Sequence, residues 1–561
     1  MKDDIRTQFD MDDIDELGFV KIDLLGLRTL STLMESLRLI KRNNNGELPF
    51  KHFYEWNFEW EKYYEDPAVW DSICTGNNIG CFQIETNDFR SLSKRFLPRS
   101  IEDLCAMIAI FRPGITRSVD SETGLNLLEM YLQKREGKRP VTYKHPNLEK
   151  ILGVSYGSFV YQEQIMEACV ALAGYTIPET DRVRKAVAKS HYEDMVEECD
   201  VFVRKCEEQG VDRETALSIF DDMRAFGMYG FNKSHGYGYS MLAYWTAWVK
   251  YYYPREFMTA LFITNPDGNV TYTRESRRMG IEVMGPDINE SGGNFTLTTN
   301  GNIRYGLNSV KNISKSADYI QKMGPFASVQ DFAERIPAKI VNKKAILSLI
   351  KCGVFDSIAG DTKTALRQFV ENRKEFKKEL KHPDDLCPSE CEHCAGSLTM
   401  FDCYAINVEK IEDRGMHERE LLGAMVTVDP LAGYIGLIEE EQNFPGEHKM
   451  YRGEKAMIGG IISKIETMVT KRGKNVGSKM CQVWIELPIK NFEDDQDDEV
   501  MDEMEDASLS DESVKLVVFP QVYAKIQSEL EVGSPVLVKI EKLYDGLSLK
   551  NVYRLDKLSQ Q

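Results

Sequence analysis

The apolar residues of this 561-residue chain change their spacing part-way along, which limits the folds open to it. From about residue 66 to residue 262 they recur mostly at helical intervals, and from residue 455 onward β-branched residues alternate with polar ones. The clearest alternating segments are 457–462, 483–487, 514–519 and 536–540. About five short strands at the end of a chain favour a small barrel. The sequence therefore predicts a multidomain α+β protein with a largely helical body and a C-terminal β-barrel.

A short apolar segment near the start of the chain carries one aspartate. Residues 19–25 are typical of a strand, Gly26 ends it, and helical spacing follows from Leu30 to Ile40. Asp23 has apolar neighbours on both sides, and a buried carboxylate is costly unless it is paired or binds a metal. The alternative is an aspartate at a strand end that faces water. Composition alone leaves both interpretations open.

The net charge of −19 is unevenly distributed. Between Glu493 and Glu512 twelve residues are acidic and none is basic, which is typical of a solvated loop rather than a binding tail. Basic residues cluster at 134–144 and 182–189, and phosphate binding depends on such local patches, so nucleic acid is not excluded as a ligand. No apolar run reaches the roughly 18 residues of a membrane helix. The N-terminus is unlike a signal peptide, and the scattered cysteines suit a reducing cytoplasm.

Two segments combine the side chains that a polyphosphate and a base would need. Residues 229–235, Tyr-Gly-Phe-Asn-Lys-Ser-His, place a ring, polar donors, a cation and a histidine together. Upstream, a predicted helix carries Arg184, Lys185 and Lys189 at i, i+1 and i+5. Arginine offers a forked donor and lysine a point charge, and both suit triphosphate oxygens. The alternatives are a solvated basic face for the helix and a structural role for His235.

Several blocks of this sequence occur in the same order in one protein family. The blocks are 7–10, 18–28, 80–85, 111–114, 161–166, 174–189 and 229–235. They resemble the end of the palm and the fingers of the bacterial replicative DNA polymerase III alpha subunit, a C-family DNA polymerase. The resemblance runs from about residue 6 to residue 556. It implies the C-terminal portion of such a polymerase, in a split or truncated form.

The resemblance also implies how the chain is divided into domains. The expected regions are the end of a nucleotidyltransferase-like palm at 1–40, largely helical polymerase fingers at 41–280, a helix-hairpin-helix (little-finger) region at 281–371, a linker at 372–454 and an OB-fold β-barrel at 455–561 with an acidic loop at 490–513.

The resemblance implies catalytic roles for Asp23 and Lys21. Asp23 matches the family's third metal-binding carboxylate, and Lys21 lies beside it and faces the phosphates. Nucleotidyl transfer uses two Mg²⁺ ions, which one aspartate cannot hold. In the family the other two aspartates come from an upstream Asp-x-Asp motif of the palm, which the match does not include. We therefore expect a separate chain with the N-terminal polymerase half (the PHP domain and palm) to supply them.

Further residues are expected to contact the incoming dNTP and the primer-template DNA. For the dNTP, the resemblance implies Arg112, Arg184, Lys185, Lys189, Asn232, Lys233 and His235. For DNA, it implies Lys311 in the helix-hairpin-helix region, and Lys471, Arg472 and Lys474 in the first hairpin of the barrel. Asn312 and Ser314 stand where the family favours glycine. Because only glycine enters the left-handed region freely, this departure weakens the expectation that the hairpin grips phosphate.

The linker holds two further motifs. Residues 397–401 resemble the family's sliding-clamp pentapeptide, with Leu398, Met400 and Phe401 filling the groove and Ser397 in place of the usual Gln. The alternative is an ordinary apolar patch. The second motif is a cysteine cluster, Cys387, Cys391, Cys394 and Cys403. Four thiolates could close a structural zinc site, although the last gap is short for a zinc ribbon, and the alternative is unrelated reduced thiols.

Two hypotheses about function follow from the resemblance. In the first, the chain is part of a DNA-directed DNA polymerase that binds dNTP and primer-template, gives one metal-binding aspartate and is active only with a partner chain. In the second, it is a non-catalytic accessory module that binds DNA and the sliding clamp. An incomplete piece of a longer polymerase is a third interpretation. All of them place the protein in the cytoplasm of a bacterial or phage-infected cell, with no membrane partner.

Overall fold

A computed structural model gives the structure of the protein. It describes residues 8–10, 13–14, 17–19, 26–50, 64, 66–111, 125–188, 192–227, 230–313, 316–373, 376, 414–427, 431, 433–443, 450–469, 478–487, 513–532, 534–543 and 546–558.

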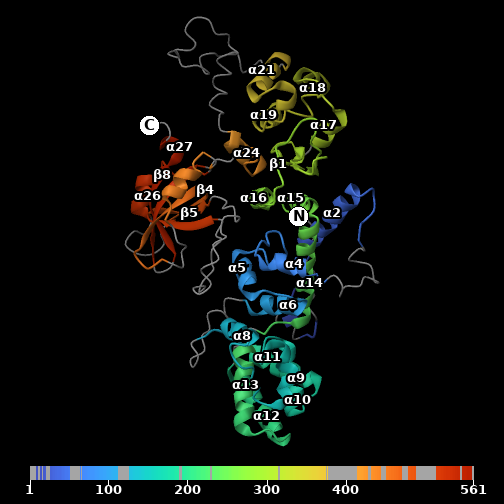
Figure 1. Cartoon of the computed structure of the whole chain (residues 1–561), viewed down its shortest axis with the longest axis vertical. Helices are drawn as coiled ribbons and strands as arrows, with labels where there is room; N and C mark the ends of the chain where they lie inside the picture. The colour runs from blue at the N-terminus through green and yellow to red at the C-terminus, as the bar shows by residue number, and fades with distance from the viewer. Residues whose placement is uncertain are drawn as a thin grey trace.

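The described helices form an elongated column with the barrel beside it (Figure 1). The first helices of the column are α2 (Arg28–Asn43), α4 (Pro67–Cys74), α5 (Asn87–Phe96), α6 (Ile101–Ile110) and α8 (Leu127–Arg135). The lower end of the view holds α9 (Glu149–Leu152), α10 (Gln162–Ala173), α11 (Ile177–Ala188), α12 (Tyr192–Glu208) and α13 (Arg213–Gly227). The chain then returns through α14 (Lys233–Tyr252), α15 (Pro254–Thr264) and α16 (Asn269–Arg278).

Local capping explains where several of these helices begin. Asp66 caps α4 by accepting from the backbone N–H of Ala68, and Pro67 follows as the first helical residue. Ser100 caps α6 in the same way, by accepting from Asp103. All of α6 except Glu102 and Asp103 is buried, and the helix packs against α14. The two helices therefore form the centre of the column, and the start of α14 is placed by this packing.

The predicted helix after Gly26 is confirmed as α2, which buries Leu33, Leu37 and Ile40. It ends in the expected asparagine-rich turn, where Asn45 and Gly46 both have positive φ. Residues 20–25, where the preceding palm strand was expected, lie outside the described residues.

The upper end of the column is a small α+β unit of short elements. Its three-stranded sheet has the order β1 (Val283–Met284), β3 (Ile303–Arg304), β2 (Thr296–Leu297). Its helices are α17 (Ala317–Met323), α18 (Val329–Arg335), α19 (Lys343–Lys351), α20 (Asp356–Ala359) and α21 (Thr362–Asn372). Phenylalanines fill the interior, since Phe332 contacts Phe326, Phe355 and Phe369 with ring centroids 5.0–5.9 Å apart.

The C-terminal strands close into a barrel in the order β4-β5-β6-β8-β7, which confirms the predicted barrel and is consistent with an OB-fold. The elements are α24 (Arg414–Leu422) and α25 (Ile435–Glu441) before it, then β4 (Lys455–Val469), β5 (Lys479–Glu486), β6 (Ser513–Val518), α26 (Pro520–Ile526), β7 (Pro535–Lys542), β8 (Leu547–Arg554) and α27 (Leu555–Leu558). β4 pairs with β7 along its first half and with β5 along its second, and its register shifts at Ile462. Such an irregularity lets one strand serve both sides of a closed barrel.

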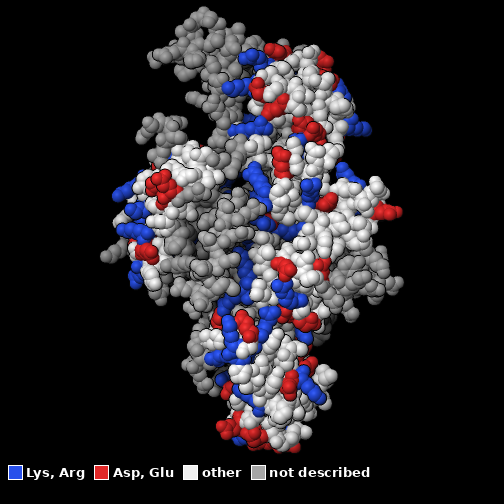
Figure 2. All heavy atoms as spheres, viewed as in Figure 1, with Lys and Arg blue, Asp and Glu red and all other residues white. Residues whose placement is uncertain are grey.

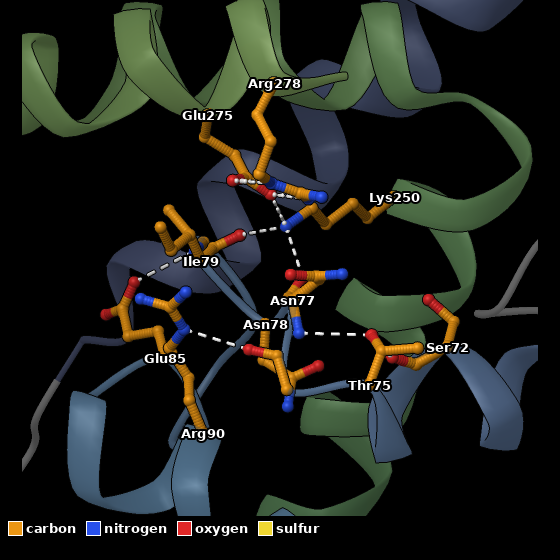
Figure 3. Close-up of polar contacts among 12 residues, drawn as sticks. Ser72, Thr75, Asn77, Asn78, Ile79, Glu85, Arg90, Lys250, Glu275 and Arg278 are labelled. Carbon is orange, nitrogen blue, oxygen red and sulfur yellow. Dashed lines mark hydrogen bonds and ion pairs between the residues drawn. The ribbon is translucent and has the colours of Figure 1, made fainter. Parts of the chain in front are cut away.

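A buried ion pair ties α14 to α16 beneath the turn that follows α4 (Figure 3). The Lys250 ammonium donates to the backbone oxygens of Asn77 and Ile79, at 2.7 and 2.8 Å, and to Glu275 at 2.6 Å. Arg278 donates to the same carboxylate through two nitrogens, at 2.7 and 2.8 Å. The side chains of Lys250 and Glu275 are only 7% and 1% exposed, so the partners drawn in Figure 3 replace their hydration.

This network predicts a specific acid sensitivity. Burial alone raises the pKa of the Glu275 carboxyl, but the hydrogen bond from Arg278 and the charge of Lys250 outweigh it and lower the pKa from 4.5 to about 2. A lowered pKa gives stability that is full above pH 4.5 and lost as the pH falls toward 2. Denaturant unfolding between roughly pH 6 and roughly pH 2 should therefore show the advantage of the native chain over Glu275→Gln shrinking with acid. A constant difference would contradict the assignment.

Candidate functional site

Two of the motif segments, far apart in the sequence, lie side by side. Tyr161 and Phe231 form an isolated parallel β-bridge. The backbone N–H of Gln162 donates to Phe231 O at 2.9 Å, and the Gln162 side-chain amide donates to Gly230 O at 3.0 Å. The start of α10 therefore holds the loop that leads into α14, and with it the described part of the 229–235 motif.

The N-terminus of α14 presents three of the predicted residues in one turn. Asn232 is its N-cap and accepts from the backbone N–H of His235 at 2.7 Å. The Lys233 backbone N–H donates to both carboxylate oxygens of Glu163 at 3.0 Å, and its ammonium lies 5.5 Å from the centre of the Tyr161 ring. A helix N-terminus favours anions, and here α10 already supplies one carboxylate. An incoming phosphate would therefore share this end of the helix with Glu163.

Arg184 approaches the same bridge from α11. Its guanidinium donates to Asp181, one turn earlier, at 2.6 and 2.9 Å, and makes a long contact of 3.5 Å with Gln162 Oε1. The side chain keeps 27% of its surface exposed. Since Gln162 also holds the loop before α14, the structure brings Arg184 and the 230–235 segment onto one scaffold. Asp181 holds the guanidinium in a fixed direction while leaving part of it accessible.

His235 is exposed and continues a column of rings. Its imidazole lies 4.1 Å from the Tyr239 ring and 5.9 Å from the Phe231 ring, between centroids. Tyr239 in turn contacts Phe82 at 5.0 Å. Phe82 belongs to the 80–85 block, so a third matching segment reaches this site. A ring column that ends in an accessible imidazole suits contact with a sugar or a base.

Part of the expected basic surface is structural. Figure 2 shows Lys and Arg side chains along the middle of one face, over the region of α5 and α8. Arg135 there packs over the Phe96 ring at 4.7 Å, bonds the Phe96 carbonyl and pairs with Asp103 at 3.0 Å. Lys144 donates to Ser218 O at 3.0 Å and pairs with Asp222 at 2.7 Å. These two cations hold helices together, so they count less toward phosphate binding than the sequence alone indicates.

Many of the predicted site residues lie outside the described residues. They are Lys21, Asp23, Arg112, Lys189, the linker residues Leu398, Met400 and Phe401, the cysteines Cys387, Cys391, Cys394 and Cys403, the barrel residues Lys471, Arg472 and Lys474, and the side chain of Lys185. The described residues contain no group of three or more His, Cys, Asp or Glu that could hold a metal ion. Across the described ranges, no helix combines the length and apolar character that a bilayer crossing requires.

The hairpin with the non-glycine substitutions keeps a left-handed residue. Asn312 adopts a φ of +75°, and its side-chain amide donates to Ser348 Oγ on α19 at 3.0 Å. Asparagine is among the few residues that tolerate this region. Beside it, Lys311 is exposed while its backbone N–H donates to Leu421 O at the end of α24. Asn312 therefore adopts the left-handed region without being glycine, while contact between this hairpin and phosphate stays a prediction and Ser314 lies outside the described residues.

The hairpin geometry makes Asn312 a discriminating position. We expect Asn312→Gly to keep the turn, since glycine adopts positive φ freely, and to lose only the bond to Ser348. A β-branched residue should be strained there by about 1–3 kcal/mol, so Asn312→Val should lower both stability and duplex DNA binding. Thermal unfolding and duplex titrations of the two variants check this. Equal behaviour of the glycine and valine variants would refute it.

Residues 29–210 match the family model for the bacterial DNA polymerase III alpha subunit finger domain, and residues 280–366 match a helix-hairpin-helix motif. The DNA polymerase III subunit alpha of Thermus aquaticus is 31% identical over 570 residues, covering 95% of this chain and 41% of the relative. The subunit from Escherichia coli K12 is 30% identical, covering 84% and 41%. The chain belongs to the bacterial DNA polymerase III alpha subunit family.

The match covers most of this chain but less than half of each alpha subunit. The subunit from Aquifex aeolicus is 29% identical over 96% of this chain and 42% of its own length. The chain thus spans about two fifths of the alpha subunits it matches. Within that part, the multidomain α+β fold is as expected, with largely helical fingers, a helix-hairpin-helix motif and a closed five-stranded barrel.

Sequence reasoning missed the residues that hold this site together. Gln162 and Glu163 were part of a matching block, but no role was expected for them, and Asp181 was not considered as the partner of Arg184. Gly236 was also missed: a Cβ there would lie 2.4 Å from Phe231 Cε1 and 2.9 Å from Cys105 Sγ. A glycine directly after a His-containing motif at a helix start was the available signal, because glycine is otherwise unfavourable inside a helix.

Proposed function

We propose that this chain is the nucleotide- and DNA-binding part of a replicative DNA-directed DNA polymerase. The observation that carries the proposal is the convergence of Arg184, Lys233 and His235 on the bridge between Tyr161 and Phe231. Two cations and an accessible imidazole, supplied by two helices and braced by carboxylates, suit a triphosphate with its sugar. The relatives' name, DNA polymerase III subunit alpha, supports templated DNA synthesis as the reaction.

In this proposal each residue of the cluster has a distinct task. Arg184 offers forked N–H donors to phosphate oxygens, and Asp181 keeps the guanidinium aligned. Lys233 adds a point charge at the positive end of α14. His235, whose ring contacts that of Tyr239, offers an accessible ring to the sugar or base. Lys185, Lys189 and Arg112 would extend the phosphate contacts.

Asp23 is proposed as one Mg²⁺ ligand with Lys21 beside it, and the other two aspartates come from a palm supplied by another chain. Magnesium, when bound there, would activate the primer hydroxyl and steady the leaving pyrophosphate. The residues of the described cluster bind and orient the nucleotide for that step.

Nucleotide binding by the isolated chain tests the cluster directly. We expect calorimetric titrations with dNTP to show an affinity that is about tenfold or more weaker in Arg184→Ala than in the native chain, because a charge-assisted hydrogen bond is lost. Arg224→Ala is the matched control, since Arg224 makes the same i, i+3 pair with Asp221 on α13 at 3.0 Å. Equal affinities of the two variants for dNTP would contradict the assignment of Arg184 as a phosphate-binding residue.

The second candidate function is a DNA-binding module without catalysis. The left-handed Asn312 with the exposed Lys311 beside it, and the closed barrel, favour DNA contact independently of the fingers cluster. Lys471, Arg472 and Lys474 would contact single-stranded template, and Leu398, Met400 and Phe401 would bind the sliding clamp. The cysteine cluster would bind a structural zinc ion, which a metal assay of the purified chain can test. Duplex and clamp binding with no extension in any mixture would favour this alternative.

A further inference from the structure

A cavity of about 460 Å³ lies away from the fingers cluster, where several units of the chain meet. Its walls come from Arg277 on α16, Arg304 on β3, Asp356 on α20 and Arg414 on α24, together with the turn at 285–287. Figure 1 shows α24 in this position, between the helical column and the barrel. The volume is within the roughly 300–1,000 Å³ of small-molecule sites.

The carboxylates of this cavity already have partners. Asp356 accepts from Arg414 at 2.6 Å, and Glu282 accepts from the Asn302 side chain at 2.8 Å. Asp287 accepts from the backbone N–H groups of the next turn at 2.8 and 2.9 Å. These acids are therefore engaged within the protein by Arg414, by a side-chain amide and by backbone N–H groups.

The arginines leave an excess of donors. Arg304 donates to Gly285 O at 2.9 Å and pairs with Glu290, but its buried Nε–H has no acceptor among the described residues. Arg277 has five N–H donors and uses one of them within the described chain, toward Val426 O at 2.7 Å. A buried donor without an acceptor is costly. A ligand with several acceptor oxygens would relieve that cost.

The wall that carries Arg414 is a strap between units. On this strap, residues 414–427, the buried Glu418 accepts from the backbone N–H groups of Val426 and Thr427 at 2.7 and 2.8 Å, which fixes the turn after α24. Arg277 holds the same turn from α16, and Arg419 donates to Ile462 O in the barrel at 3.3 Å. A ligand in the cavity would thus contact α16, the β1–β3 sheet and the strap at once.

We propose that this cavity binds a phosphoryl group, gripped by Arg304 and Arg277. Two guanidinium groups from separate elements, one of them with a buried Nε–H that has no acceptor among the described residues, suit the acceptor oxygens of an oxyanion. The phosphoryl group can belong to a small molecule such as a nucleoside monophosphate or to the DNA backbone. The site is separate from the nucleotide cluster at Arg184. Because its walls come from three units, occupancy also stabilises their arrangement.

Calorimetry with dAMP, inorganic phosphate and a short DNA duplex as separate probes tests the proposal. Each titration is run on the native chain and on Arg184→Ala, so that binding at the fingers cluster is recognised. We expect affinity for at least one probe to fall about tenfold or more in both Arg304→Met and Arg277→Gln. Arg304→Lys keeps the charge but not the Nε donor, so its affinity for that probe should lie between those of the native chain and Arg304→Met. A loss confined to the duplex assigns the phosphoryl group to DNA; a loss with dAMP or phosphate assigns it to a small molecule.

Arg335→Met is the matched control for these variants. Arg335 lies in the same unit, also bonds a carbonyl, that of Pro325 at 2.9 Å, and a carboxylate, that of Asp331 at 3.0 Å, yet does not line the cavity. Should Arg304→Met fail to fold, Arg277→Gln carries the test, since it removes a single carbonyl bond. Absence of binding by all three probes, or equal losses in Arg335→Met, would overturn the proposal.

Discussion

Replacing Lys250 with alanine is expected to lower the free energy of unfolding by about 3–5 kcal/mol, the range for breaking one side of a buried ion pair. The ammonium is bonded to Glu275 and to two backbone oxygens of the turn after α4. Its removal leaves a carboxylate that is 1% exposed with Arg278 as its remaining cation, and two carbonyls without their donor. The loss of stability arises mostly because these buried polar groups lose a hydrogen-bond donor, and less because the attraction between the two charges is lost.

Thermal and urea unfolding of Lys250→Ala, followed by circular dichroism, measures this effect. Lys557→Ala is the control, because Lys557 also pairs with a glutamate, Glu529, at 2.8 Å but in exposed surroundings. Such a surface pair contributes about 0–1 kcal/mol. A Lys250→Ala loss no larger than that of Lys557→Ala would show that the pair in Figure 3 does not hold α14 to α16.

Gly236→Ala is expected to damage both stability and nucleotide binding. The added methyl would meet the Phe231 ring at 2.4 Å and the Cys105 thiol at 2.9 Å, in a place where α6 and α14 pack closely. Overpacking of this kind costs about 1–3 kcal/mol. Relief requires Phe231 to move, and Phe231 carries the bridge that positions Lys233 and His235. Affinity for dNTP should therefore fall with stability.

Gly238→Ala is the matched comparison, two residues further along the same helix. Nothing lies within 4 Å of a Cβ at Gly238, so the change should stabilise the helix by about 0.5–1 kcal/mol. Unfolding curves and dNTP titrations of the two variants separate close packing from helix propensity. If both alanines stabilise the protein, the contact with Phe231 and Cys105 is not restrictive, and the role given to Gly236 is wrong.

The fold could be predicted well where local pattern determines it. Alternation of apolar residues identified four barrel strands, because one face of each, as with Val483 and Ile485, is fully buried. The fifth strand, β8, was less apparent since Lys550 and Asn551 interrupt its alternation. The helix ending at Asn43 was equally clear, because its apolar stripe and its turn residues agree.

The site was harder to predict because its contacts join distant segments. The sequence motifs identified Arg184, Lys233 and His235 as candidate site residues. The local sequence does not predict that Gln162 links the loop before α14 to Arg184. The same holds for Cys105, whose thiol lies against α14 and whose pKa is raised by burial. Such pairs are set by helix packing, which single-sequence periodicity does not specify. Asn312 shows the converse, since a left-handed turn can persist without glycine when a second residue anchors the side chain.

Mg²⁺-dependent primer extension tests the central claim most directly. The native chain is assayed alone and in a mixture with a candidate partner that carries the PHP domain and palm. The Asp23→Ala and Arg184→Ala variants of this chain are each assayed in a mixture with the same partner. Our account predicts extension only in the mixture, abolished by Asp23→Ala and strongly reduced by Arg184→Ala. Absence of extension despite complex formation and DNA binding, or full activity of the Asp23→Ala mixture, would contradict it.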